Sequence, residues 1–540
     1  MHRVHALFHA NAVDYIIILV YFAFVLGVGF VLRNRVRTGE DFFLSGRSIP
    51  AWITGLAFLS ANLGALEILG MTASGAEYGM LTTHFYWIGA IPAMLFLGLY
   101  MMPFYYVSKV RSVPEFLKLR YNEATRALNA IAFAVMTVLT SGISLYSMAL
   151  IFQILIGWSF DTSILVSALV VLIYVALGGL TSSIFNEVVQ FFLIWAGLLP
   201  IPLIGLHNLG GWQGMMSRLP AGFGHLWANL GSPSHNPMGI GWLGVVLGLG
   251  FVLSFGYWTT DFLVVQRTLA AKDLRAAQLT PIYAAFFKMI VPILVIIPGL
   301  IALAIFPKIG HSPNMSYNLA LPLLIAKYYP PGMLGLGLTA MLASFMSGMA
   351  GNVTAFTTVW TYDIYQAYIK KDAPDKHYVN MGRWAVVVGV IISIGTAYFA
   401  AGFPSVMDYM QTLFSFFNAP LFATFLLGMF WKKATPWGGF WGLLAGIAGA
   451  FAMYFFLPAH MFSSPDAGNF WRAWWAWVIT VVVTVLVSLV TQGKRPEELE
   501  GLVYGLSKKP DYSGYPWYKR PGYLAAIVFV ILVGLNIAFW

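Results

Sequence analysis

The sequence contains no cysteine and little charge, since only 9% of its 540 residues are Asp, Glu, Lys or Arg. Soluble globular proteins carry about 25%, so a soluble fold is excluded. The absence of cysteine excludes disulfides and thiolate metal sites. No G-x-x-x-x-G-K-[ST], H-E-x-x-H or G-x-S-x-G motif occurs. The longest polar intervals, 207–238 and 494–521, are too short for a soluble domain, which argues against an ATP-driven pump.

Long apolar segments dominate the chain, and 59% of its residues are hydrophobic. The segments lack the alternation of a membrane barrel and are too long for its strands. We therefore predict an all-α polytopic membrane protein with about fourteen transmembrane helices. The first segment is too long for a signal peptide and lacks a small-residue cleavage site, so we expect a retained span. The segments are 13–32, 51–75, 81–107, 127–157, 162–178, 184–206, 239–264, 277–306, 331–366, 384–403, 405–431, 435–457, 472–493 and 521–540.

The basic residues are distributed unequally between the two sides of these segments. Six alternate loops hold 24 of the 30 Lys and Arg residues. By the positive-inside rule these loops face the cytoplasm, which places both termini outside. The net charge of +10 thus reflects topology and does not indicate nucleic-acid binding. Short loops, the lack of cysteine and the absence of a targeting peptide favour a bacterial inner membrane, with the lipid bilayer as the surroundings.

Two segments carry polar residues and glycine where lipid contact would favour apolar side chains. The second contains Asn62, Gly64 and Glu67, and the seventh contains the polar, glycine-interrupted stretch 254–261. Interrupted helices at corresponding positions in two halves indicate a midplane binding site in an inverted-repeat transporter. Glycines that merely let helices pack closely are the alternative. A charge at the bilayer centre is functional by default, which favours the binding site.

Other intramembrane polar groups are few. Lys288 lies too far from the membrane surface to reach water, so it needs a partner or a watery cavity; a structural ion pair with a membrane carboxylate is the alternative. Glu187 is either part of an ion path or a solvated carboxylate at a helix start. Gln411 needs a hydrogen-bond partner. No histidine cluster has metal-ligand spacing, and no catalytic constellation is present, so we do not expect an enzyme.

Several short motifs follow one another in a familiar order. With them the sequence resembles the sodium:solute symporter family, in particular its sodium/glucose and sodium/galactose cotransporters. The resemblance spans about residues 12–435. The motifs are Asp41-Phe42-Phe43-Leu44-Ser45-Gly46-Arg47, Ser60-Ala61-Asn62-Leu63-Gly64, Ser112-Val113-Pro114-Glu115-Phe116-Leu117, Gly178-Gly179-Leu180, Tyr257-Trp258-Thr259-Thr260-Asp261 with Gln266-Arg267-Thr268-Leu269-Ala270-Ala271-Lys272, Asp363-Ile364-Tyr365 and Gly428-Met429-Phe430-Trp431-Lys432-Lys433.

This resemblance implies a leucine-transporter-type core of two inverted five-helix repeats, with one helix before it and three after. The expected divisions are an N-terminal helix with its inner loop (1–50), the first repeat (51–206), an external loop (207–238), the second repeat (239–431) and three C-terminal helices (432–540).

The resemblance also implies a sodium site. Its ligands would be the backbone carbonyls of Ser60, Leu63 and Ser344 and the hydroxyl of Ser347. Sugar symporters usually have a second serine where this chain has Gly348, which removes one oxygen ligand. Because a hard cation needs a full shell of oxygens, a water or a shifted hydroxyl such as that of Ser60 must complete the shell.

The sugar-binding positions of the family match in part. Asn62, Lys288 and Gln411 match sugar-binding residues, and Tyr257 matches an aromatic gate. Glu67 replaces a Gln or His, Tyr86 replaces a Glu beside Trp87, Gly89 replaces a small polar residue and Ser254 replaces an Asn. The mixture of aromatic faces, amides and charges is typical of sugar sites. We include Tyr86 and Trp87 among the expected solute ligands.

The function implied is sodium-coupled symport of a small polar solute by alternating access, with a galactose- or glucose-like monosaccharide as the expected solute. The closest alternative keeps the fold and the sodium but transports an amino acid, a carboxylate or a nucleoside. A channel would show selectivity-filter or charge-ring patterns, and a receptor would bind without flux. The Glu67 carboxylate can be ionised beside Lys288 or sodium, ionised beside solute hydroxyls, or protonated. Our hypothesis is that it accepts hydrogen bonds from two hydroxyls of one sugar ring.

Overall fold

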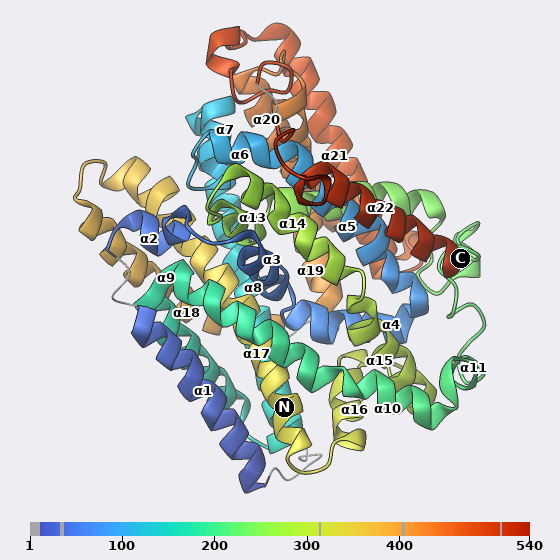
Figure 1. Cartoon of the computed structure of the whole chain (residues 1–540). Coiled ribbons are helices and arrows are strands. Elements are labelled where there is room, and N and C mark those ends of the chain that lie inside the picture. Colours follow the sequence, from blue (N-terminus) through green and yellow to red (C-terminus); the bar gives the residue numbers. More distant parts are fainter. Residues whose placement is uncertain (1–10, 33–36, 313–314, 402–405, 508–509) are drawn as a thin grey trace.

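A computed structural model of the chain describes residues 11–32, 37–312, 315–401, 406–507 and 510–540. Within these ranges the protein consists of helices and connecting segments and contains no β-strand (Figure 1). A single isolated bridge joins Ile49 to Ala271. The predicted all-α class is therefore confirmed.

The helices follow the predicted apolar segments closely. The principal elements are α1 (Ala12–Leu32), α3 (Ala51–Asn62), η3 (Leu66–Gly70), α4 (Met71–Tyr78), η5 (Phe85–Ala90), α5 (Ile91–Phe96), η6 (Leu97–Met101), α6 (Met102–Val107), α7 (Val113–Arg120), α8 (Glu123–Ile156), α9 (Phe160–Leu198), α10 (Pro200–Leu209), η8 (Gly244–Ser254), α12 (Phe255–Thr260), α13 (Phe262–Leu269), α14 (Leu274–Lys288), α15 (Val291–Ile305), α16 (Ala320–Tyr328), α17 (Met333–Thr358), η10 (Val359–Ile369), α18 (Asp375–Ala400), α19 (Val406–Phe430), α20 (Pro436–Phe456), α21 (Pro465–Val490) and α22 (Pro521–Ala538).

Eleven helices in the described ranges are long and apolar enough to cross a membrane, and two bent pairs raise this number to thirteen. A shorter apolar helix, Phe160–Ile173, is the first part of α9. Segments 162–178 and 184–206 both lie in α9, and they are divided by a kink at Gly179, whose backbone is not helical. Gly179 has φ 56°, and a Cβ there would lie 2.5 Å from the carbonyl oxygen of Phe42. The count of fourteen spans remains a prediction.

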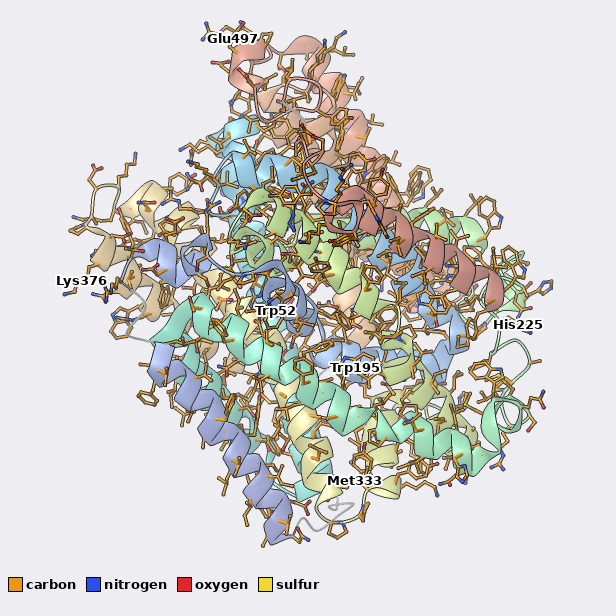
Figure 2. The ribbon with its side chains drawn as sticks, viewed as in Figure 1. Trp52, Trp195, His225, Met333, Lys376 and Glu497 are labelled. Atoms are coloured by element: carbon orange, nitrogen blue, oxygen red, sulfur yellow. The ribbon has the colours of Figure 1, made fainter. Side chains whose placement is uncertain are left out.

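The surface agrees with a lipid environment. Large apolar side chains stand exposed on the helix flanks, as Trp52 does with 58% of its surface accessible (Figure 2). Lys376, in the first turn of α18, and Glu497, in a short 3₁₀ helix (Pro496–Leu499), lie by contrast at the edge of the molecule. Apolar flanks between charged ends are the pattern expected where lipid tails replace water.

Both predicted helix breaks are present. The first separates α3 from η3 and α4, with a bend of 58°, and the second separates α12 from α13, with a bend of 48°. In the second, the chain becomes extended at Asp261, whose carboxylate accepts the N–H of Leu263 at 2.9 Å and caps α13. The break is therefore not at Gly256, which lies inside α12 where a Cβ would meet the carbonyl oxygen of Asn418 at 2.7 Å. The assignment of the two repeats remains a prediction.

Helix α17 lies centrally and packs against α1, α3, α8, α9 and α13 (Figure 1). Its N-terminus is held by the buried Asp14 of α1, whose Oδ1 accepts the N–H groups of Gly332 at 2.8 Å and Gly335 at 2.6 Å. A carboxylate at a helix N-terminus satisfies free N–H groups and complements the helix dipole. The first helix thus fixes the helix that passes closest to the first break.

Arg120 holds the C-terminal end of helix α19 and the turn that follows it. This fully buried guanidinium donates to the carbonyl oxygens of Gly428 at 2.5 Å, Trp431 at 3.0 Å and Ala434 at 3.0 Å. We expect Arg120→Ala to destabilise the protein by about 2–5 kcal/mol, because buried carbonyls lose charged donors. Thermal unfolding in detergent measures this. Lys118→Ala, on the same helix but 47% exposed, is the control, and equal melting of the two variants would contradict the assigned role.

Candidate functional site

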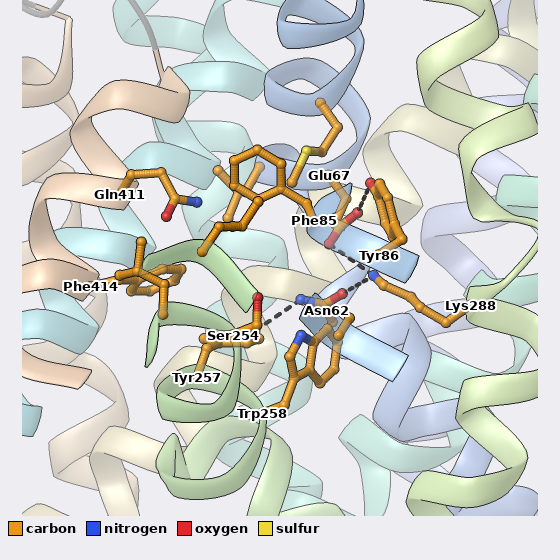
Figure 3. Close-up of a pocket in the computed structure, with 15 residues that line it drawn as sticks. Asn62, Glu67, Phe85, Tyr86, Ser254, Tyr257, Trp258, Lys288, Gln411 and Phe414 are labelled. Atoms are coloured by element: carbon orange, nitrogen blue, oxygen red, sulfur yellow. Dashed lines mark hydrogen bonds and ion pairs between the residues drawn. The ribbon is translucent and has the colours of Figure 1, made fainter. Parts of the chain in front are cut away.

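A cavity of about 40 Å³ lies beside the first helix break and is enclosed by side chains from both halves of the chain (Figure 3). Segments η3, η5, η8, α12, α14 and α19 contribute to its wall. The lining residues are Asn62, Leu66, Glu67, Met71, Phe85, Tyr86, Ala90, Leu249, Leu253, Ser254, Tyr257, Trp258, Lys288, Gln411 and Phe414. Six of the seven predicted solute ligands are among them. We call this space the solute pocket.

A buried ion pair forms one side of the solute pocket. Lys288 Nζ lies 2.8 Å from Glu67 Oε1, with the two side chains 0% and 5% exposed. The hydroxyl of Tyr86 donates to the other carboxylate oxygen of Glu67. Two opposite charges in contact cancel each other, so the pair adds no net charge to the pocket. Lys288 therefore makes the ion pair considered as its structural alternative, and this pair faces the cavity.

Asn62 connects this ion pair to the predicted gate. Its Oδ1 accepts a hydrogen bond from Lys288, and its Nδ2 donates to the hydroxyl of Tyr257 at 3.0 Å. The ring of Tyr257 packs against Phe414 with centroids 4.9 Å apart. Both ends of the amide are thus engaged, which fixes Asn62 and Tyr257 together at the floor of the pocket.

Gln411 lies across the pocket from the ion pair (Figure 3). Its Nε2 reaches only the sulfur of Met407, at 3.9 Å. Its Oε1 is buried and accepts no hydrogen bond from any described residue. A buried amide oxygen without a donor costs free energy, so this atom marks a position where a hydroxyl of a solute would be stabilised.

The structure does not bring Trp87 into the solute pocket. Its ring packs against Phe539 at 5.6 Å, and its indole N–H donates to the carbonyl oxygen of Met289 at 3.0 Å. Consecutive helical residues point in different directions, so Tyr86 and Trp87 do not share a face. The prediction that Trp87 lines the site with Tyr86 is corrected accordingly.

Gly89 and Ser254 depart together from the family pattern, and the structure explains why. A Cβ on Gly89 would lie 2.1 Å from the Oγ of Ser254. Any larger residue at position 89 would therefore displace this hydroxyl. The two substitutions fit each other, and Ser254 occupies the space beside the pocket that Gly89 leaves free.

The four predicted sodium ligands lie together where α17 passes the first break. The hydroxyls of Ser60 and Ser347 are 3.2 Å apart, and Ser344 Oγ donates to the carbonyl oxygen of Leu63 at 2.5 Å. Gly348 packs against Gly64, since a Cβ on Gly348 would be 3.1 Å from the Cα of Gly64. The Ser60 hydroxyl is thus beside Ser347, as the predicted replacement of the hydroxyl absent at Gly348 requires.

Glu187 is fully buried within α9 and forms an ion pair with Arg267. Its Oε1 also accepts the hydroxyl of Ser183 at 2.7 Å. The alternative of a solvated carboxylate at a helix start is therefore wrong, because the kinked α9 continues through this residue. A role in an ion path remains a prediction.

Sequence reasoning missed part of the pocket wall. Trp258 places its ring 5.0 Å from Lys288 Nζ, at the distance of a cation–π contact, and Tyr86 does so at 4.9 Å. Phe414 also lines the pocket, although it was not among the residues predicted to bind the solute. Its position three residues after Gln411, on the same helical face, was the available signal.

Two broken spans beside a buried pocket with polar side chains are the arrangement typical of secondary transporters. The sodium:solute symporter family profile matches residues 42–446, and the chain belongs to this family. It is 32% identical over 474 residues to the sodium/glucose cotransporter of Vibrio parahaemolyticus, covering 83% of this chain and 86% of that one. It is 28% identical to sodium/glucose cotransporter 4 of Danio rerio, covering 86% and 75%.

Solved structures agree with this assignment at the level of the fold. A substrate-bound, outward-open Na⁺-coupled sialic acid symporter superposes with a TM-score of 0.75 at 20% identity, covering 90% of this chain and 99% of that one. The predicted fold class is confirmed. The protein is a sodium-coupled solute symporter and not an enzyme.

Proposed function

We propose that the transported solute is a neutral monosaccharide held in the solute pocket. The observation that carries this proposal is the ion pair between Glu67 and Lys288, whose charges cancel at the pocket wall. A carboxylate solute would find the charge of Lys288 already neutralised by Glu67, and the negative charge of Glu67 would repel it. Sugar hydroxyls, by contrast, can donate to the carboxylate and to Gln411 Oε1, and can accept from the ammonium group.

Aromatic faces supply the remaining requirement of a sugar site. Tyr86, Tyr257 and Trp258 line the pocket, and flat rings pack well against the C–H faces of a pyranose. The pocket volume of about 40 Å³ leaves room for only a few water molecules. We therefore expect the walls to separate when solute binds, as alternating access requires.

We place the coupling sodium between Ser60, Leu63, Ser344 and Ser347. Carbonyl and hydroxyl oxygens are suitable ligands for a hard cation, and the Ser60 hydroxyl can replace the one absent at Gly348. One sodium moving through 100 mV releases about 2.3 kcal/mol, and a tenfold concentration gradient adds about 1.4 kcal/mol. Together these sustain roughly a 500-fold accumulation of solute.

Uptake by purified protein in proteoliposomes tests the proposed solute. The panel contains labelled glucose and galactose, a nucleoside, a monocarboxylate and a neutral amino acid, each with and without an inward sodium gradient. We expect sodium-dependent uptake of a hexose. Uptake of the amino acid or carboxylate alone would reject the sugar assignment while keeping sodium symport.

Ser347→Ala tests the sodium site. Loss of this hydroxyl is expected to raise the sodium concentration for half-maximal uptake several-fold and, by reciprocal linkage, to weaken apparent solute affinity at fixed sodium. Thr339→Ala is the matched control, since it removes a buried hydroxyl from the same helix that bonds only to the carbonyl oxygen of Gly335. Unchanged sodium dependence in Ser347→Ala would remove this residue from the site.

A further inference from the structure

A second cavity, also about 40 Å³, adjoins the solute pocket at the hydrogen-bonded pair Asn62 and Tyr257. It shares Asn62, Leu66, Tyr257 and Phe414 with the solute pocket as a common wall. We propose that this cavity is a second monovalent cation site, occupied by sodium and centred on Asp261. This inference rests on the proposed sodium coupling but concerns a different set of residues.

Asp261 supplies the charge that attracts a cation. The residue is 4% exposed, and its Oδ1 accepts the N–H of Leu263 at the start of α13. Neither Lys nor Arg lines the cavity. Three other buried carboxylates in the described ranges have basic partners, since Glu67 pairs with Lys288, Glu187 with Arg267 and Asp363 with Arg126. An ionised carboxylate buried without a partner is costly, and a bound cation removes this cost.

The other polar residues of the cavity offer neutral oxygens. Asn352 donates its Nδ2 to the carbonyl oxygen of Gly348 at 3.0 Å, which leaves its Oδ1 as an acceptor. Thr140 donates its hydroxyl hydrogen to the carbonyl oxygen of Met136 at 2.8 Å, which leaves lone pairs on the oxygen. Ser144 Oγ lies 3.6 Å from where a Cβ on Gly348 would be. One carboxylate with amide and hydroxyl oxygens is a ligand set for a hard cation.

The lining of the cavity selects the ligand class. It presents one carboxylate with amide and hydroxyl oxygens and no basic side chain, and a space of this volume holds a dehydrated cation with one or two waters. Gly348 lines this cavity, and because it has no side chain the space between α8 and α17 stays open. The departure of Gly348 from the family pattern thus provides room here.

The shared wall predicts coupling between solute and this cation. Asn62 bonds to Lys288 on the solute side and to Tyr257 on the cation side. A cation bound at Asp261 would fix Tyr257 and, through it, Asn62 in the shared wall of the solute pocket. Because coupling between two sites is reciprocal, bound solute should in turn raise the affinity for this cation.

Asp261→Asn tests the proposal, because Asn caps helices as well as Asp does but carries no charge. Binding of radioactive sodium to the purified full-length protein is counted without solute. We expect two sodium ions per wild-type chain and one per Asp261→Asn chain, whereas a Ser347→Ala chain binds two, one of them with several-fold lower affinity. A single sodium per wild-type chain, or two per Asp261→Asn chain, would overturn the second site.

Ser144→Ala provides a test that does not touch the helix cap, and Ser147→Ala is its matched control. Both replace a buried serine of α8, but only Ser144 lines the cavity. Ser144→Ala is expected to weaken the second sodium several-fold while Ser147→Ala binds as wild type does; equal binding by the two variants overturns the ligand set. If no sugar is transported, the proposed solute fails, but the sodium count still decides the second site.

Discussion

Replacing Lys288 by alanine is expected to reduce solute affinity by about a hundred- to several thousandfold. Removing one partner of a buried ion pair costs about 3–5 kcal/mol, because the remaining charge stays buried without compensation. Here Glu67 would lose its partner at 2.8 Å and Asn62 would lose the donor to its Oδ1. Solute-dependent uptake in proteoliposomes, measured over a wide solute range, gives the change.

A double variant separates binding from stability. Lys288→Met with Glu67→Gln replaces the ion pair by neutral groups of similar shape, which often restores stability. We expect this protein to melt near the wild-type temperature and still to bind solute poorly. Normal uptake by Lys288→Ala would place the solute elsewhere, and recovery of solute affinity in the double variant would assign the pair a structural role alone.

Glu67→Gln is expected to lower solute affinity about ten- to a hundredfold while sodium activation at saturating solute hardly changes. Gln keeps the shape and one acceptor but loses the charge, and bonds to a charged group are worth about 1.5–3 kcal/mol against about 1 kcal/mol for neutral ones. Both carboxylate oxygens already accept one donor, from Lys288 and from Tyr86. Each oxygen has a second lone-pair site, which is sufficient for the two sugar hydroxyls proposed.

The opposite result would move Glu67 to the cation. If Glu67→Gln weakens sodium activation first and leaves sugar selectivity unchanged, the carboxylate compensates for the hydroxyl absent at Gly348. Tyr86→Phe is the control for the second oxygen, because it removes the hydroxyl that donates to Glu67 and preserves the ring. Its effect on solute affinity should be smaller than that of Glu67→Gln and in the same direction.

The sequence by itself determined the elements of this protein and the places where they break. Hydrophobic runs, loop charge and polar residues inside apolar segments are local properties, and in a membrane each unpaired polar group is so costly that it marks a site wherever it occurs. Asn62, Glu67, Lys288 and Gln411 were identified for this reason. The family motifs then predicted four sodium ligands, and the structure brings these residues together.

Only the tertiary structure decided which of these groups are partners and which way they face. Glu67 and Lys288 are 221 positions apart, and no local pattern pairs them. Trp87 turns away from the pocket although Tyr86 faces it, because side-chain direction depends on the packing of the whole helix. Asp261 gains its cavity from helices of both halves of the chain. The burial of a side chain and the identity of its partner depend on several helices at once, so both are defined only when the helices pack together.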